Sequence, residues 1–138
     1  MDEKKLIEGL NRDLADELAT ICCYIQQASV ALGTAGHEIR EFLKREVPDE
    51  MHHAMFLADK IVALGGTPVA KPAAFREQQD LKAILEYDLE LERQAINHYT
   101  ERIQQAEALG QIGLRVQLES LLADETDHAE AIARLLGK

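Results

Sequence analysis

Two short segments carry one pattern, Asp49-Glu50-Met51-His52-His53 and Asp124-Glu125-Thr126-Asp127-His128, in which a histidine follows a glutamate by three residues. Residues three apart on a helix share a face, so each glutamate and its histidine point the same way. A further glutamate precedes each segment by 33 residues, Glu17 in one half and Glu92 in the other. A tyrosine also repeats, as Tyr24 and Tyr99, so both halves of the chain follow one plan with a shift of 75 residues.

The segments around these residues have the composition of helices. Stretches rich in Ala, Leu, Glu, Gln and Arg lie between three clusters of glycine. No run alternates β-branched and aromatic residues between turn signals, as a strand would. We predict four helices, over residues 3–32, 36–64, 77–109 and 111–136. Pro48 falls inside the second helix, and we expect it to kink that helix rather than split it.

The positions of the glutamates predict how the helices are arranged. The two glutamates of each half are equally far from the turn between their helices, so an antiparallel pair places them at one level. The long connection after residue 64 has about a dozen residues and can run back for roughly 40 Å, about one helix length. We therefore predict an all-α, up-down-down-up four-helix bundle, formed by one domain of residues 1–138, with both glutamate layers at one height.

Six residues of metal-ligand type then converge in the apolar core: Glu17, Glu50, His53, Glu92, Glu125 and His128. Burying four carboxylates together is costly unless their charge is neutralised. Two divalent cations balance the four negative charges, and two neutral imidazoles complete the coordination. Carboxylate with imidazole suits iron or manganese, whereas calcium prefers oxygen ligands and structural zinc usually takes sulfur.

Asp49 and Asp124 directly precede the two glutamates of the repeated segments. Metal-bound histidines usually donate their second N–H group to a carboxylate. We predict that Asp124 pairs with His53 and Asp49 with His128, each across the bundle.

Charge and composition exclude other classes of protein. The net charge is −10, with 25 acidic and 15 basic residues, which suits cations and disfavours nucleic acid and anionic membrane surfaces. The two cysteines are adjacent, so zinc-ribbon and rubredoxin-type sites are excluded. No apolar run approaches the ~20 residues of a membrane span, and the N-terminus is unlike a signal peptide. We expect a cytoplasmic protein.

At these residues the chain resembles the ferritin-like di-iron carboxylate superfamily, and within it bacterioferritin, over nearly its whole length. The resemblance implies two iron ions per chain, with manganese or zinc as substitutes. Glu50 and Glu125 would bridge the two ions. Glu17 and His53 would complete one coordination shell, and Glu92 and His128 the other.

The resemblance also implies a ferroxidase, which oxidises Fe(II) with dioxygen or peroxide in iron storage or detoxification. Tyr24, two turns beyond Glu17, would supply an electron. Met51 matches the position at which bacterioferritins can bind haem b between two subunits. The family implies a homo-oligomer, but bacterioferritins continue into a fifth short helix, and this sequence ends ten residues after His128. We expect a dimer or a smaller symmetric shell as readily as a cage.

Two other functions stay open. One is a rubrerythrin-like peroxide reductase, although that family usually adds a glutamate near the third-helix ligand, where this chain has Leu89 and Ala95. The other is a bundle that carries metal or haem without catalysis.

Overall fold

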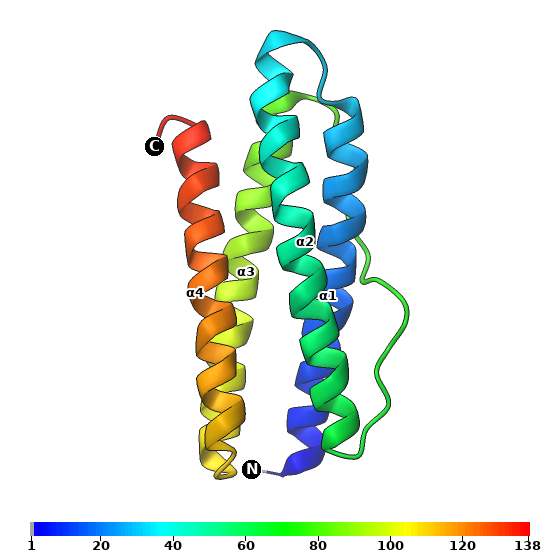
Figure 1. Ribbon diagram of the computed structural model, residues 1–138, viewed down its shortest axis with the longest axis vertical. Coiled ribbons are helices and arrows are strands. Elements are labelled where there is room, and N and C mark those ends of the chain that lie inside the picture. The colour runs from blue at the N-terminus through cyan, green and yellow to red at the C-terminus, as the bar shows by residue number, and fades with distance from the viewer. Residues whose placement is uncertain (1) are drawn as a thin grey trace.

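The computed structural model describes residues 2–138, which form four long α-helices (Figure 1). Their bounds are Glu3–Val30 for α1, Gly33–Ala63 for α2, Leu81–Ala108 for α3 and Ile112–Leu135 for α4. Helices α1 and α4 run in one direction and α2 and α3 in the other. The predicted all-α, up-down-down-up bundle is therefore confirmed, and no strand occurs within residues 2–138.

The bundle consists of two helical hairpins. Helix α1 packs chiefly on α2, and α3 chiefly on α4, while α1 and α3 make the main contact between the hairpins. The crossover from α2 to α3 runs along the outside of the bundle beside α1 (Figure 1). The backbone N–H of Ala73 donates to the carbonyl of Ala15, and the side chain of Asn11 bonds to Thr67 and Val69. These contacts attach the crossover to α1.

The beginning of α3 differs from the prediction. The helix begins at Leu81 and not at residue 77. The side chain of Asp80 accepts a hydrogen bond of 3.0 Å from the backbone N–H of Ala83, which caps the first turn. The good helix formers before Asp80 are instead part of the crossover, because helix propensity is a weak preference beside a cap and tertiary contacts.

Helix α2 also departs from its predicted bounds. It begins at Gly33, three residues earlier than expected, where φ of +77° suits a residue without a side chain. It passes through Pro48 without a break, so the proline does not split it. The other helix ends lie within two residues of their predicted positions.

Apolar residues fill the two ends of the bundle and leave a polar layer between them. One cluster includes Leu43, Ile84 and Ile132, and the other includes Leu10 and Leu118. The buried acids and histidines occupy the middle of the helices, between these clusters. This arrangement buries the polar layer between two apolar regions, so charges there interact strongly. Within residues 2–138, no helix is long and apolar enough to cross a membrane.

We expect Asp80→Ala to destabilise the protein, because it leaves the first backbone N–H groups of α3 without their cap. The expected loss is about 1 kcal/mol, or about 3 °C in Tm. Thermal unfolding followed by circular dichroism measures it. Glu77→Ala is the control, since Glu77 is exposed and precedes the helix. If α3 began near residue 77, the two variants would behave alike.

Candidate metal centre

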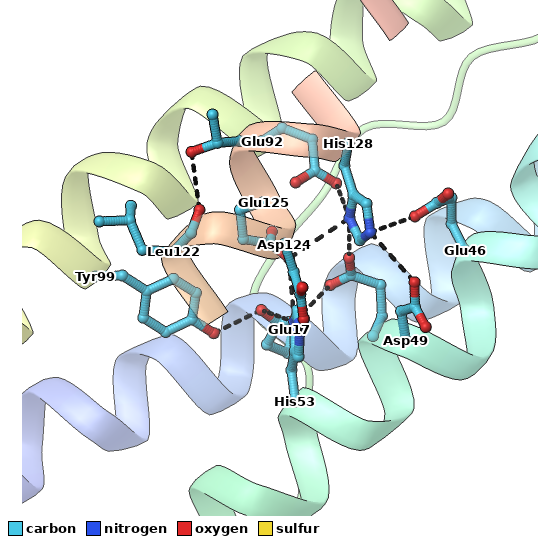
Figure 2. Close-up of polar contacts among 12 residues, drawn as sticks. Glu17, Glu46, Asp49, His53, Glu92, Tyr99, Leu122, Asp124, Glu125 and His128 are labelled. Carbon is cyan, nitrogen blue, oxygen red and sulfur yellow. Dashed lines mark hydrogen bonds and ion pairs between the residues drawn. The ribbon is translucent and has the colours of Figure 1, made fainter. Parts of the chain in front are cut away.

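All six predicted ligand residues come together at mid-height in the bundle. Each is buried, with at most 6% of its surface exposed. Glu17 comes from α1, Glu50 and His53 from α2, Glu92 from α3, and Glu125 and His128 from α4. Figure 2 shows the five of these side chains that it labels, Glu17, His53, Glu92, Glu125 and His128, pointing toward one another. Helical spacing within each segment and equal distances from the turns produce this convergence.

The ligand atoms form two overlapping groups. Glu17, Glu50, His53 and Glu125 make one group, and Glu50, Glu92, Glu125 and His128 make the other, with one ligand atom per residue and all within 4.8 Å of one another. Only Glu50 and Glu125 belong to both groups. These two glutamates therefore lie between the two groups.

The two imidazole rings face the shared glutamates. His53 Nδ1 lies 3.0 Å from Glu125 Oε1, and His128 Nδ1 lies 3.0 Å from Glu50 Oε1. The rings lie nearly parallel, with centroids 6.4 Å apart. Each half of the centre thus directs one imidazole nitrogen inward.

Several polar atoms at this level lie close to one another but make no contact of hydrogen-bond geometry within the described chain. They include both Nδ1 atoms, both oxygens of Glu50, and one oxygen each of Glu17, Glu92 and Glu125. Buried polar atoms are rarely left unpaired, and carboxylate oxygens with imidazole nitrogens are ligands of iron and manganese. The set of residues therefore fits two bound divalent ions.

The outer nitrogen of each histidine contacts an aspartate from the facing helix. His53 Nε2 lies 2.9 Å from Asp124 Oδ2, and His128 Nε2 lies 3.4 Å from Asp49 Oδ2. Both pairs cross between α2 and α4, as the sequence suggested. An Nε2–H donated to a carboxylate leaves the Nδ1 lone pair free to face the centre.

Glu46 is a partner that the sequence analysis did not assign. Its Oε2 lies 2.5 Å from His128 Nε2, nearer than Asp49. Glu46 is one helical turn before Glu50, so the i, i+4 relation was the available signal. At its outer Nε2 atom, His128 consequently has two acidic partners, whereas His53 has one.

Two tyrosines donate hydrogen bonds to the outer glutamates. The Tyr24 hydroxyl donates to Glu92 Oε1 over 2.7 Å, and the Tyr99 hydroxyl donates to Glu17 Oε1 over 2.6 Å. Burial, together with the nearby carboxylates, raises the pKa of both tyrosines, so both stay protonated donors. Only Tyr24 was singled out from the sequence, although the repeat pointed equally to Tyr99.

The metal-free centre holds protons. Burial, followed by the charges of neighbouring glutamates, raises the pKa of Glu50 and of Glu125. Burial lowers the pKa of His53, but Glu17 and its other acidic neighbours outweigh burial and raise that pKa to about 9. Protons therefore supply, in the absence of metal, part of the positive charge that two cations would supply.

Two cavities reach the centre from opposite sides. One, of about 350 Å³, lies between α1 and α3 beneath the crossover, and Glu17, Tyr99 and Glu125 line its inner end. The other, also about 350 Å³, lies between α2 and α4 beside His53 and Asp124. Small solutes can approach the centre from either side.

Met51 lies away from the centre, on the outside of α2. Half of its surface is exposed, and so is most of Met55 one turn later. A haem bound at Met51 would therefore lie on the surface of the bundle and not in the buried polar layer.

Comparison with known proteins gives one consistent family. The family described as Ferritin-like domain matches residues 7–138. A solved structure, a ferritin-like, diiron-carboxylate protein from Bacillus anthracis, is 40% identical and superposes with a TM-score of 0.95 over 99% of each chain.

Curated relatives carry two different names. The chain is 30% identical to a bacterioferritin of Streptomyces coelicolor, over 93% of this chain and 77% of that protein. It is 28% identical to a nutrient stress-induced DNA-binding protein of Synechococcus, over 96% of this chain and 81% of that protein.

The raised pKa values predict how pH affects stability without metal. A folded-state pKa of about 9 for His53 means that its contribution is present below its ordinary value of 6.5 and is lost as pH rises through about 9. The raised pKa values of Glu50 and Glu125 act in the same direction. We expect chelator-treated protein to lose on the order of 3 kcal/mol of unfolding free energy between about pH 6 and pH 9.5.

Urea unfolding across this pH range measures the effect. His53→Gln should flatten the curve, whereas His52→Gln, at the exposed neighbouring position, should not. Stability that rises over the same range would contradict the assignment of protons to the centre.

Proposed function

The chain belongs to the ferritin-like family, and from that premise we propose that it is a ferroxidase whose centre binds two iron ions and oxidises Fe(II) with dioxygen or peroxide. The observation that carries this proposal is the pair of overlapping ligand groups that share Glu50 and Glu125. Bound iron supplies the one-electron chemistry of such a centre. The protein supplies the ligands, the charge balance and the access routes.

Each ligand has a role in the proposal. Glu50 and Glu125 would be shared by the two ions, Glu17 and His53 would help to hold one ion, and Glu92 and His128 would help to hold the other. Two contacts support this set: His53 Nε2–H donates to Asp124, and His128 Nε2–H faces Asp49 and Glu46. These contacts fix the orientation of the two imidazoles. Manganese or zinc fits the same ligands as a substitute without turnover.

Tyr24 and Tyr99 hold the outer carboxylates in place. Each buried hydroxyl occupies one oxygen of a glutamate and leaves the other without a partner. We assign Tyr24 the further role of electron donor during reduction of the oxidant, since its hydroxyl directly contacts Glu92. The same contact lets its proton move to the carboxylate as the electron leaves.

The charge of the chain favours Fe(II) as the partner and disfavours nucleic acid. Its net charge is −10. Binding to a phosphate backbone relies on clusters of Lys and Arg, whereas acidic surfaces attract cations. We also propose that the protein forms a homo-oligomer, because α1 and α2 expose several large apolar residues on their outer surfaces: Ile25, Met51, Met55 and Val62. We propose a cytoplasmic location as well.

An anaerobic titration of metal-free protein with Fe(II) tests the proposal. We expect a break at two iron ions per chain and rapid formation of Fe(III) on admission of air or peroxide. Glu125→Ala should slow oxidation more than about 100-fold, since even the loss of an outer partner of a metal ligand costs about 10–100-fold. Glu130→Ala, an exposed glutamate on the same helix, is the control.

The outcomes separate the candidate functions. Oxidation that continues beyond two irons supports storage, and oxidation that stops at two supports a redox cycle. Reaction with peroxide but not dioxygen favours a peroxide reductase. Binding without oxidation by either oxidant would overturn the ferroxidase proposal in favour of a metal carrier.

A further inference from the structure

The cavity between α1 and α3 is larger than the simplest oxidants of the proposed reaction need. Its volume of about 350 Å³ falls in the range of roughly 300–1,000 Å³ that is typical of small-molecule sites. Dioxygen and hydrogen peroxide would each occupy a small part of it. The cavity reaches Glu17 and Glu125, so a molecule bound in it would lie beside the metal centre. The surplus space therefore needs its own explanation.

The charged residues around this cavity are already paired within the chain. The pairs are Asp13 with Arg102, Asp16 with His98, and Glu90 with Arg76, at N···O distances of 2.8, 3.2 and 3.0 Å. Glu17 and Glu125 are the remaining acids of the lining, and both belong to the proposed metal centre. The cavity thus offers no spare charge to an ionic ligand, and an uncharged molecule fits it better.

The walls of the cavity are apolar at several positions and come from three parts of the chain. The apolar side chains are Ala19 from α1, Leu91 and Ala95 from α3, and Phe75 from the crossover. Thr20 and Gln94 add uncharged polar groups. Small-molecule sites commonly combine apolar walls with a few polar groups that orient the ligand. An amphipathic molecule with one polar end therefore matches this lining.

Phe75 is held over the cavity by its neighbour in the crossover. The backbone N–H of Arg76 donates to the Tyr87 hydroxyl over 2.9 Å, and the Arg76 guanidinium group lies 4.6 Å from the centre of the Tyr87 ring. The ion pair with Glu90 adds a third contact between Arg76 and α3. Phe75 itself is partly buried against the apolar cluster that contains Tyr87. The aromatic roof is therefore fixed in place before a ligand arrives.

The cavity between α2 and α4 has the same volume but a different lining. Asp49 and Asp124 border it, and about half of each side chain is exposed. Among the described residues that line it, none is Lys or Arg. This opening thus exposes acidic groups to solvent, whereas the α1–α3 cavity has its acids paired. The two sides of the centre favour ligands of different charge.

We propose that the α1–α3 cavity binds an organic hydroperoxide as the oxidant of the centre. The apolar group of this molecule lies beneath Phe75 and between Leu91 and Ala95, and its peroxide group lies at the polar end formed by Glu17 and Glu125. The inference rests on the proposed function and narrows it, because it names the class of peroxide that the site accepts.

The reaction balances with Fe(II) as the source of electrons. The O–O bond of the hydroperoxide breaks and accepts two electrons, one from each of two Fe(II) ions. Two protons from solvent complete the products, which are one molecule of the alcohol, one of water and two Fe(III) ions. The cavity is large enough to hold the alcohol after the bond has broken, so the product leaves by the route of the substrate.

Calorimetric titration of the zinc-loaded protein with cumyl alcohol tests the site without redox chemistry. This alcohol is the product expected from cumene hydroperoxide and has the same aromatic group. We expect saturable binding of one molecule per chain. Ala95→Phe fills the cavity and should abolish binding, whereas Ser120→Phe places the same side chain at the α2–α4 cavity and should not. Absence of binding to the wild type, or equal loss in both variants, would overturn the proposal.

Iron oxidation by cumene hydroperoxide tests the role of the aromatic roof. Phe75→Ala should raise the hydroperoxide concentration for half-maximal Fe(III) formation at least about 10-fold, since even one methylene group in an apolar pocket is worth about that much. Its rate with hydrogen peroxide should not change. Phe56→Ala, the same substitution beside the α2–α4 cavity, is the matched control and should change neither value. An unchanged concentration in Phe75→Ala, or an equal rise in Phe56→Ala, contradicts the assignment.

Phe75→Ala also protects the test against misfolding. Phe75 lies on the crossover, outside the four helices, so this variant remains informative should Ala95→Phe not fold.

The oxidants separate this inference from the proposed function. Fe(III) formation with dioxygen or hydrogen peroxide, but not with cumene hydroperoxide, would refute the inference and leave the ferroxidase proposal intact. Failure with all three oxidants would overturn the ferroxidase proposal together with the peroxide step. Saturable binding of cumyl alcohol that Ala95→Phe removes would still support the cavity as a site for an uncharged organic molecule.

Discussion

The mutual repulsion of four glutamates buried at one level is the constraint on which the rest of this structure depends. These carboxylates are buried between apolar clusters at the two ends of the bundle, which strengthens the charge interactions among them. Two histidines, two tyrosines and bound protons provide partial compensation in the metal-free state. The same residues fit two divalent cations, which would complete the compensation.

The internal repeat distributes this charge over two nearly equivalent halves, and its departures from symmetry carry chemical information. The position equivalent to Glu46 is Leu121, so of the two histidines His128 alone has a second acidic partner at its Nε2 atom. Arg102 compensates Asp13, whereas Gln27 leaves Asp88 without a cation. In both cases an additional acidic side chain, Glu46 or the uncompensated Asp88, lies on the side of the centre that contains Glu92 and His128. An arrangement of this kind distinguishes two metal positions whose ligands are the same.

The hairpins and the crossover determine how the centre is reached. Each hairpin supplies one glutamate pair and one histidine, and the crossover brings the second hairpin into the same vertical register. It also covers the cavity between α1 and α3, where Phe75 and Arg76 lie beside the route toward Glu17. Asp124 borders the second cavity, between α2 and α4. The connection that sets the topology thus also shapes one access path.

The sequence by itself determined the six converging residues, the direction of each helix and the aspartate partners of the histidines, because helical periodicity and distance from a turn are local properties of the chain. It placed the start of α3 wrongly, since Asp80 caps the helix later than propensity indicated. Only the tertiary structure showed that Glu46 contacts His128, and that Tyr99 donates a hydrogen bond to Glu17 as Tyr24 does to Glu92. It also showed that Asp88 lacks the cationic partner that Asp13 has in Arg102. These features depend on which side chains meet across helices far apart in sequence, and packing alone decides that.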